Sequence, residues 1–354
     1  MAPPGSTPIN PSTVSPGLVS FGPLVLDEVV FSGGRILSNM PGGTGLYAIL
    51  GGRIVVPPAQ SALVGFLVVA GNDFPASVLQ QMQSWGINLG VHRRTDVPST
   101  RGRLQYHDSS FGRKTFAFTT TPLHPTPEDL TINGGSLLRA SAFHTLATPE
   151  KLESLIASLQ QTRGRLNISG RPRLVWEPAP FACKSENLNA HLQACKLVNV
   201  FSPNHLEMLS LVGADQPGGQ PFSRHQMETA AMRFLNAGIG PDGTGAVVVR
   251  CGEHGSLAVS RSYQARWFPA FHDRTPHRVV DATGAGNAFL GGFTIGLHVS
   301  GGLTEAVVRG SVAASFVIEQ FGLPQRTVNG AAELWNGESA STRIRQYRQR
   351  IGQA

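Results

Sequence analysis

The chain has 354 residues, 41% of them hydrophobic, a net charge of +7, and only 14% charged residues. This composition can build a large buried core and excludes a disordered polyelectrolyte. The chain has three cysteines and no CxxC pair, and its longest apolar run, residues 62–70, is too short to span a bilayer. We therefore expect a cytoplasmic protein with no membrane partner.

The first segments lead from a polar tail into the fold. Residues 1–17 are rich in Pro, Ser and Thr, which predicts a disordered tail. The next stretch, residues 18–31, predicts a buried strand followed by a turn. Gly22 and Asp27 stand at the end of that strand. A carboxylate there serves either as a turn or helix cap or as a ligand for a bound molecule.

The chain then alternates between predicted strands and predicted helices. Predicted strands cover residues 63–70, 142–145, 173–176, 198–201, 246–250, 257–260 and 279–281. Predicted helices cover residues 44–50, 74–85, 148–160, 204–212, 223–236, 285–299 and 304–321. This order favours one α/β domain, residues 18–330, with a mostly parallel sheet covered on both faces.

One pair of segments differs from the others. Residues 102–107 and 114–119 alternate apolar and polar side chains, and the turn at 108–113 joins them. Period-2 alternation predicts strands with one packed face and one exposed face. We therefore expect a small hairpin outside the main sheet.

The strongest local signal is the segment 281–287, which reads D-A-T-G-A-G-N. It follows two β-branched residues, which predict the end of a buried strand, and it opens a predicted apolar helix. The first N–H groups of a helix lack intrahelical partners, and the helix dipole favours negative charge there. The segment predicts an anion site. It is not a P-loop, because the P-loop lysine is missing.

This pattern resembles the second signature of the ribokinase-like PfkB family of carbohydrate and nucleoside kinases, D-T-x-G-A-G-D. The resemblance implies a three-layer α/β/α sandwich with a small β lid, formed here by about residues 31–41 and 99–121. It implies that Gly284, Ala285 and Gly286 form the anion hole for the transferring phosphoryl group. It also implies ATP and Mg²⁺ as cofactors. The G-A-G-N wording is similar to a fungal branch of the family, the maintenance-of-killer type.

Other segments match the family in the same order along the chain. By resemblance, the substrate-binding residues are Asp27, Gly42, Gly43 and Tyr47, the nucleotide-binding residues are Asn204, Arg250, Gly252, Gly255, Asp281 and Thr283, and Glu207 organises the metal. Asn204 and Glu207 also have the spacing of a helix-capping pair, which is the alternative for both residues.

Three positions depart from the family pattern. Asn287 occupies the position of the catalytic Asp, Tyr47 stands where an Asn contacts substrate, and Arg250 stands where the nucleotide loop begins with Thr. An amide cannot accept a hydroxyl proton, and loss of a general base typically slows a reaction about 10² to 10⁴-fold. Two functions stay open: a PfkB-type kinase that phosphorylates a sugar or nucleoside-like molecule, and a pseudokinase acting as a sensor or scaffold.

The last segment, residues 331–354, is basic. Arg343, Arg345, Arg348 and Arg350 follow the last acidic residue, Glu338. Such a helix or tail either contacts nucleic acid or an acidic surface, or is the solvated end of an amphipathic helix. We favour the solvated helix and expect no nucleic-acid partner. A homodimer formed through the lid is the macromolecular contact we expect.

Overall fold

The computed structural model describes residues 14–108, 114–214, 221–330 and 332–352. Most of the predicted tail and most of the predicted turn at 108–113 lie outside these residues. The described end of the tail is ordered, so the prediction of disorder is wrong for residues 14–17. Gly17 donates its N–H to the carbonyl of Leu63 at 2.7 Å, and Pro16 accepts from the N–H of Ser141 at 2.9 Å.

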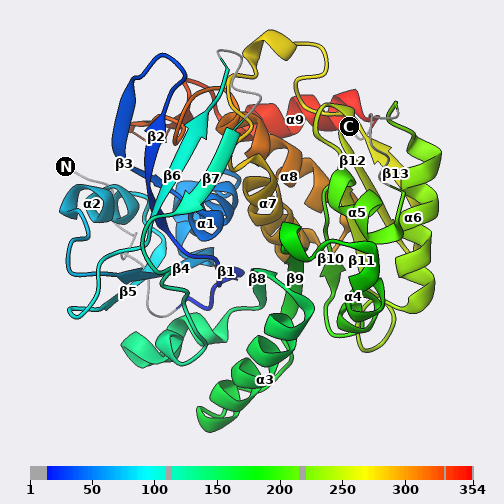
Figure 1. The fold of residues 1–354 in the computed structure, drawn as a ribbon, viewed down its shortest axis with the longest axis horizontal. Coiled ribbons are helices and arrows are strands. Elements are labelled where there is room, and N and C mark those ends of the chain that lie inside the picture. The colour runs from blue at the N-terminus through cyan, green and yellow to red at the C-terminus, as the bar shows by residue number, and fades with distance from the viewer. Residues whose placement is uncertain (1–13, 109–113, 215–220, 331, 353–354) are drawn as a thin grey trace.

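A nine-stranded sheet forms the centre of the molecule (Figure 1). In spatial order its strands are β13 (Tyr263–Phe268), β12 (Ser256–Ser260), β11 (Ala246–Arg250), β10 (Val200–Phe201), β9 (Arg173–Pro178), β8 (Ala142–Ala147), β1 (Leu18–Ser20), β4 (Val64–Ala70) and β5 (Asn88–Arg93). Neighbours from β11 to β5 pair in parallel, whereas β12 pairs antiparallel with β11 and β13. The mostly parallel sheet is therefore confirmed.

Helices cover both faces of this sheet. They are α1 (Thr44–Ile54), α2 (Ala76–Ser84), α3 (Pro149–Arg165), α4 (Leu188–Cys195), α5 (His205–Val212), α6 (Arg224–Ala237), α7 (Ala285–Ser300), α8 (Leu303–Val317) and α9 (Ala340–Arg350). Along β11, Val247 and Val249 join the core under α3 to α6, whereas Val248 joins the core under α7 and α8. Successive strand residues point to opposite faces, so one apolar strand serves both layers. The three-layer sandwich is confirmed.

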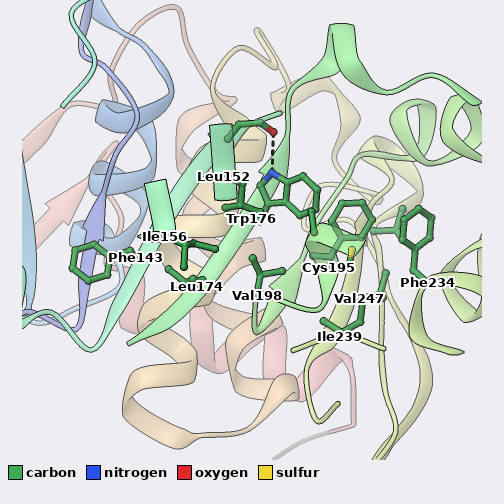
Figure 2. Close-up of a cluster of buried hydrophobic side chains, with 14 of the residues drawn as sticks. Phe143, Leu152, Ile156, Leu174, Trp176, Cys195, Val198, Phe234, Ile239 and Val247 are labelled. Carbon is green, nitrogen blue, oxygen red and sulfur yellow. Dashed lines mark hydrogen bonds between the residues drawn. The ribbon is translucent and has the colours of Figure 1, made fainter. Parts of the chain in front are cut away.

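The core beneath α3, α4 and α6 shows how these layers are joined (Figure 2). Trp176 on β9 is fully buried there and packs against Phe201 at a centroid distance of 5.1 Å. Its indole N–H donates to the carbonyl of Ala147 at 2.9 Å, which satisfies the polar atom of a buried aromatic ring. This packing fixes the carboxyl end of β9, where the site described below begins.

A second sheet of four strands lies beside the first. Its order is β3 (Ile36–Gly42), β2 (Val25–Val30), β6 (Arg101–Tyr106) and β7 (Lys114–Phe118), and we call it the lid. The prediction of one buried strand in residues 18–31 is wrong, because the chain leaves the central sheet after β1. The bend is at Gly22, whose N–H donates to Oγ of Ser20 at 3.1 Å. A β-carbon at Gly22 would lie 2.4 Å from the backbone nitrogen of Gly45, so only glycine fits.

The strand predicted at 279–281 is also wrong. The N–H groups of Val280 and Asp281 donate to the carbonyl of Ile318 at 2.7 and 3.2 Å, at the end of α8, instead of pairing with a strand. Val279 is 43% exposed. The segment before the glycine turn is therefore an irregular connection held by α8.

The basic C-terminal segment packs on the domain behind a hairpin of β14 (Arg326–Asn329) and β15 (Ala332–Trp335). Arg343 on α9 is fully buried and pairs with Glu319 at 2.9 Å and Glu338 at 2.8 Å. Arg348 and Arg350 also form ion pairs. The prediction of a solvated helix end is wrong for Arg343, because acidic residues of the domain neutralise it. Within the described parts of the chain, no helix combines the length and the apolar character needed to cross a membrane.

Candidate active site

The glycine turn sits at the start of α7. Gly284 caps this helix with a φ of +77°, a left-handed conformation that favours glycine. The N–H of Ala288 donates to the carbonyl of Gly284 at 2.9 Å, which begins the helical bonding. The N–H groups of Gly286 and Asn287 precede that bond and have no intrahelical acceptor. Ala285 is the first residue of the helix. This end of α7 is suited to bind an anion.

Tyr47 of α1 covers this turn. A β-carbon at Gly284 would lie 2.4 Å from the Tyr47 ring, and Tyr47 is only 6% exposed. Helix α1 begins at Thr44, and its N-cap residue Gly43 has a φ of +92°. The two helices then approach so closely that a β-carbon at Gly51 would lie 2.0 Å from the carbonyl oxygen of Ala288. The ring of Tyr47 is therefore packed between the N-terminal ends of α1 and α7.

Asp27 lies in the lid on β2, next to Tyr47. A β-carbon at Gly42 would lie 2.4 Å from its Oδ2 and 3.8 Å from the Tyr47 ring. The Oδ1 atom is buried and has no hydrogen-bond partner among the described residues. Burial raises the pKa of this carboxyl to about 7. Asp27 is within a strand, so the turn or helix-cap alternative is wrong, and its free oxygen suits a ligand hydroxyl.

Arg250 also lies against the glycine turn, at Gly286. It is the last residue of β11, and a β-carbon at Gly286 would lie 2.1 Å from its Nη1. Nη1 lies 2.8 Å from Oε1 of Glu177, and Nη2 donates to the carbonyl of Ser202 at 3.0 Å. The side chain is 11% exposed. A fixed guanidinium therefore borders the anion site.

Glu177 is a site residue that the sequence did not reveal. It is 5% exposed on β9, and its Oε2 accepts from Nδ2 of Asn287 at 2.5 Å. Burial raises the pKa of this carboxyl, but Arg250 and then His144 lower it more, so the net pKa lies below its usual range. The available signal was its place directly after the predicted strand at 173–176, since ligands meet the carboxyl ends of parallel strands.

Asn204 and Glu207 form the capping pair that their spacing predicts. Both carboxylate oxygens of Glu207 accept from Asn204 at 2.7 Å, one from its N–H and one from its side-chain amide. The N–H of Glu207 donates back to Oδ1 of Asn204 at 2.8 Å. Nη2 of Arg250 lies 3.6 Å from the same carboxylate. Burial raises the pKa of Glu207 to about 7.

These residues do not by themselves form a divalent-cation site. The carboxylates of Glu177 and Glu207 already face a guanidinium and amide donors. Among the described residues, no group of three or more His, Cys, Asp or Glu side chains is placed to hold a metal ion. The metal role of Glu207 stays a prediction.

Asp281 and Thr283 join the lid to α7. Asp281 accepts from the hydroxyl of Tyr106 at 2.7 Å and from Nζ of Lys114 at 3.1 Å. Nζ of Lys114 also donates to Oγ1 of Thr283 at 2.5 Å. Figure 1 shows the lid strands β6 and β7 beside α7. These two predicted nucleotide-binding residues therefore position the lid in this structure.

The two glycines of the predicted nucleotide loop lie just past β11. Gly252 has a φ of +57°, and a β-carbon there would meet nothing within 4 Å. A β-carbon at Gly255 would lie 1.9 Å from the carbonyl oxygen of Phe268. The first glycine borders open space and the second allows two backbone segments to pack closely.

Comparison with known proteins identifies the family. Residues 55–326 match the pfkB family of carbohydrate kinases. The chain belongs to this family. It is 29% identical to protein MAK32 of Saccharomyces cerevisiae over 95% of this chain and 93% of that protein. It is 28% identical to a cytidine kinase of Thermococcus kodakarensis over 86% of this chain and 97% of that protein.

The fold agrees with this membership. The structure of ribokinase from Giardia lamblia superposes with a TM-score of 0.69, at 19% identity, over 96% of this chain and 100% of that one. The predicted ribokinase-like fold and the resemblance to the fungal maintenance-of-killer branch are confirmed.

Proposed function

We propose that this PfkB-family protein transfers the γ-phosphoryl group of ATP to a hydroxyl of a sugar or nucleoside-like molecule. One observation carries the proposal. The buried Oδ1 of Asp27, which has no hydrogen-bond partner among the described residues, and the N-terminus of α7 both lie near the Tyr47 ring. A group that binds hydroxyls is thereby placed next to a group that binds phosphoryl oxygens.

The chemistry of each part follows from its residues. Asp27 accepts hydrogen bonds from acceptor hydroxyls, and the N–H groups of Gly286 and Asn287 donate to phosphoryl oxygens. ATP supplies the γ-phosphoryl group and leaves as ADP, and the proton of the acceptor hydroxyl passes to water late in the transfer. Phosphoryl transfer depends mostly on positioning and charge stabilisation, so a site without a strong base remains competent but slow.

The lid favours an acceptor with one apolar face. Phe116 and Phe118 on β7 are 48% and 46% exposed and contact each other at a centroid distance of 5.0 Å. A β-carbon at Gly102 would lie 2.4 Å from the Phe116 ring and 2.8 Å from Oδ1 of Asp27. Aromatic rings and a carboxylate oxygen that has no partner within the described parts of the chain therefore converge at the acceptor position, which suits a ring that carries hydroxyls. The likeness to a cytidine kinase supports the nucleoside side of this class.

A second function is favoured by a separate observation. The three departures from the family pattern, Tyr47, Arg250 and Asn287, all border the first turn of α7. At each of these positions the resemblance implies a family residue that contacts the substrate, the nucleotide or the reacting proton, and this chain has a different side chain there. A pseudokinase that binds nucleotide and metabolite without transferring phosphate accounts for that concentration of changes.

One experiment separates the two functions. Purified protein is incubated with ATP, with and without Mg²⁺, and a panel of sugars and nucleosides, and products are identified by mass spectrometry. Thermal shift is measured in the same samples. A phosphorylated acceptor formed over several turnovers supports the kinase. Ligand-induced stabilisation with no product supports the pseudokinase.

A further inference from the structure

The guanidinium of Arg250 stands where two acidic side chains and a helix N-terminus meet. Nη1 lies 2.8 Å from Glu177, and Nη2 lies 3.6 Å from Glu207. The same Nη1 would contact a β-carbon at Gly286 at 2.1 Å, so it lies against the first turn of α7. A nucleotide site usually places Mg²⁺ between one or two carboxylates and the substrate phosphates. Here the guanidinium of Arg250 occupies the space beside the carboxylates of Glu177 and Glu207.

The position of Arg250 is set by more than its ion pairs. Nη2 donates to the carbonyl of Ser202 at 3.0 Å, which anchors the outer side of the fork. The Nε atom is buried and has no hydrogen-bond partner among the described residues. A buried N–H without an acceptor is unfavourable, and a phosphate oxygen is a strong acceptor for a guanidinium. The Nε–H of Arg250 is therefore available to donate to an anion bound at the N-terminus of α7.

The charges of the departures support the same conclusion. By the resemblance stated above, the signature ends in Asp where this chain has Asn287, and the nucleotide loop begins with Thr where this chain has Arg250. Each exchange makes the site one unit more positive, and together they match the charge of one divalent cation. An acidic side chain at 287 would also face Glu177, which accepts from Asn287 at 2.5 Å.

We propose that Arg250 replaces the divalent cation, so that a nucleoside polyphosphate binds at the N-terminus of α7 without Mg²⁺. The guanidinium stays paired with Glu177 and lies near Glu207, and its Nε–H, which has no partner among the described residues, binds a phosphoryl oxygen. This inference rests on the proposed nucleotide site and holds for either a kinase or a pseudokinase. It differs from the family expectation only in the identity of the cation.

The test is calorimetric titration of ATP into the full-length protein in Mg²⁺ and in EDTA. For the wild type, the two dissociation constants agree within about threefold. Arg250→Thr, which restores the family residue, weakens binding in EDTA by about tenfold or more, because a hydrogen bond to a charged group is lost. Mg²⁺ then tightens ATP binding in this variant. Arg345→Thr is the matched control, because Arg345 is exposed on α9, and it behaves as wild type.

Each other outcome has a definite meaning. ATP binding to the wild type that is more than tenfold tighter in Mg²⁺ overturns the role of Arg250 and leaves the proposed function standing. No ATP binding in either buffer overturns both. If Arg250→Thr does not fold, Arg250→Lys provides the test. It keeps the charge but loses the planar fork, and it must weaken binding in EDTA while its melting temperature stays close to wild type.

Discussion

Asn287 donates its side-chain amide to Glu177 across 2.5 Å, so the residue at the family's base position is bound to a carboxylate. Glu177 is buried and also paired with Arg250 at 2.8 Å. Its depressed pKa keeps it ionised, which makes it a counter-charge and a weak proton acceptor. The arrangement explains how the site tolerates an amide where a base is expected.

The contact between Asn287 and Glu177 predicts that an Asp at position 287 can act as a general base only if Glu177 is also replaced. Asn287→Asp alone places two carboxylates within hydrogen-bond distance, and like charges this close raise a carboxyl pKa. The double variant Asn287→Asp with Glu177→Gln reverses the donor and the acceptor. We expect transfer by the double variant to be about 10² to 10⁴-fold faster than by wild type. Single-turnover phosphorylation of the acceptor measures it.

The single variants are the controls for this pair. Asn287→Asp is expected to lower the melting temperature and Glu177→Gln to leave transfer slow. If Asn287→Asp alone reached the rate and the stability of the double variant, the coupling between the two residues would be disproved.

Asp27 predicts an unusual pH dependence of stability. Its folded pKa of about 7 lies above the unfolded value of 3.8, so the folded state holds its proton more tightly. This group therefore lowers the free energy of unfolding as pH rises from about 4 to 7, by up to about 4 kcal/mol. Asp27→Asn removes that loss. The variant should be more stable than wild type at pH 8, nearly equal at pH 4, and unable to bind the acceptor.

Urea denaturation of both proteins from pH 4 to pH 8 measures this effect. If Asp27→Asn is the more stable protein at pH 8, the chain carries Asp27 at a cost in stability, which is expected of a functional residue. If the free energies of unfolding of the two proteins changed in parallel from pH 4 to pH 8, the raised pKa of Asp27 would be contradicted.

The buried arginine of α9 predicts that the basic segment stabilises the fold. Arg343 lies 3.8 Å from the centroid of the Phe316 ring and pairs with Glu319 and Glu338. Arg343→Met removes hydrogen bonds to two carboxylates, but Glu319 keeps its ion pair with Arg278 at 2.8 Å, so the substitution should cost about 1.5 to 3 kcal/mol of unfolding free energy. Arg345→Met, on the exposed face of the same helix, should change it by less than about 0.5 kcal/mol. Equal effects in urea denaturation would show that the segment is not packed as described.

The sequence predicted the elements whose patterns are local. The apolar strand that became β11 and the Asn204–Glu207 cap needed no distant partner to be recognised. Glu177 was missed because its partners, Arg250 and Asn287, are brought to it only by the fold. The strand expected at Val279 failed for a related reason, since the carbonyl of Ile318 at the end of α8 binds this connection. Local pattern located the turn, but only tertiary structure showed what surrounds it.

The most direct test of the proposed function is a single-turnover reaction with the protein in excess over γ-labelled ATP and a mixture of sugars and nucleosides. We expect the label in a small-molecule product with the wild type, more rapid labelling with the Asn287→Asp/Glu177→Gln variant, and none with Asp27→Ala. ATP that binds but stays unreacted with both the wild type and the double variant would contradict the kinase and leave the pseudokinase.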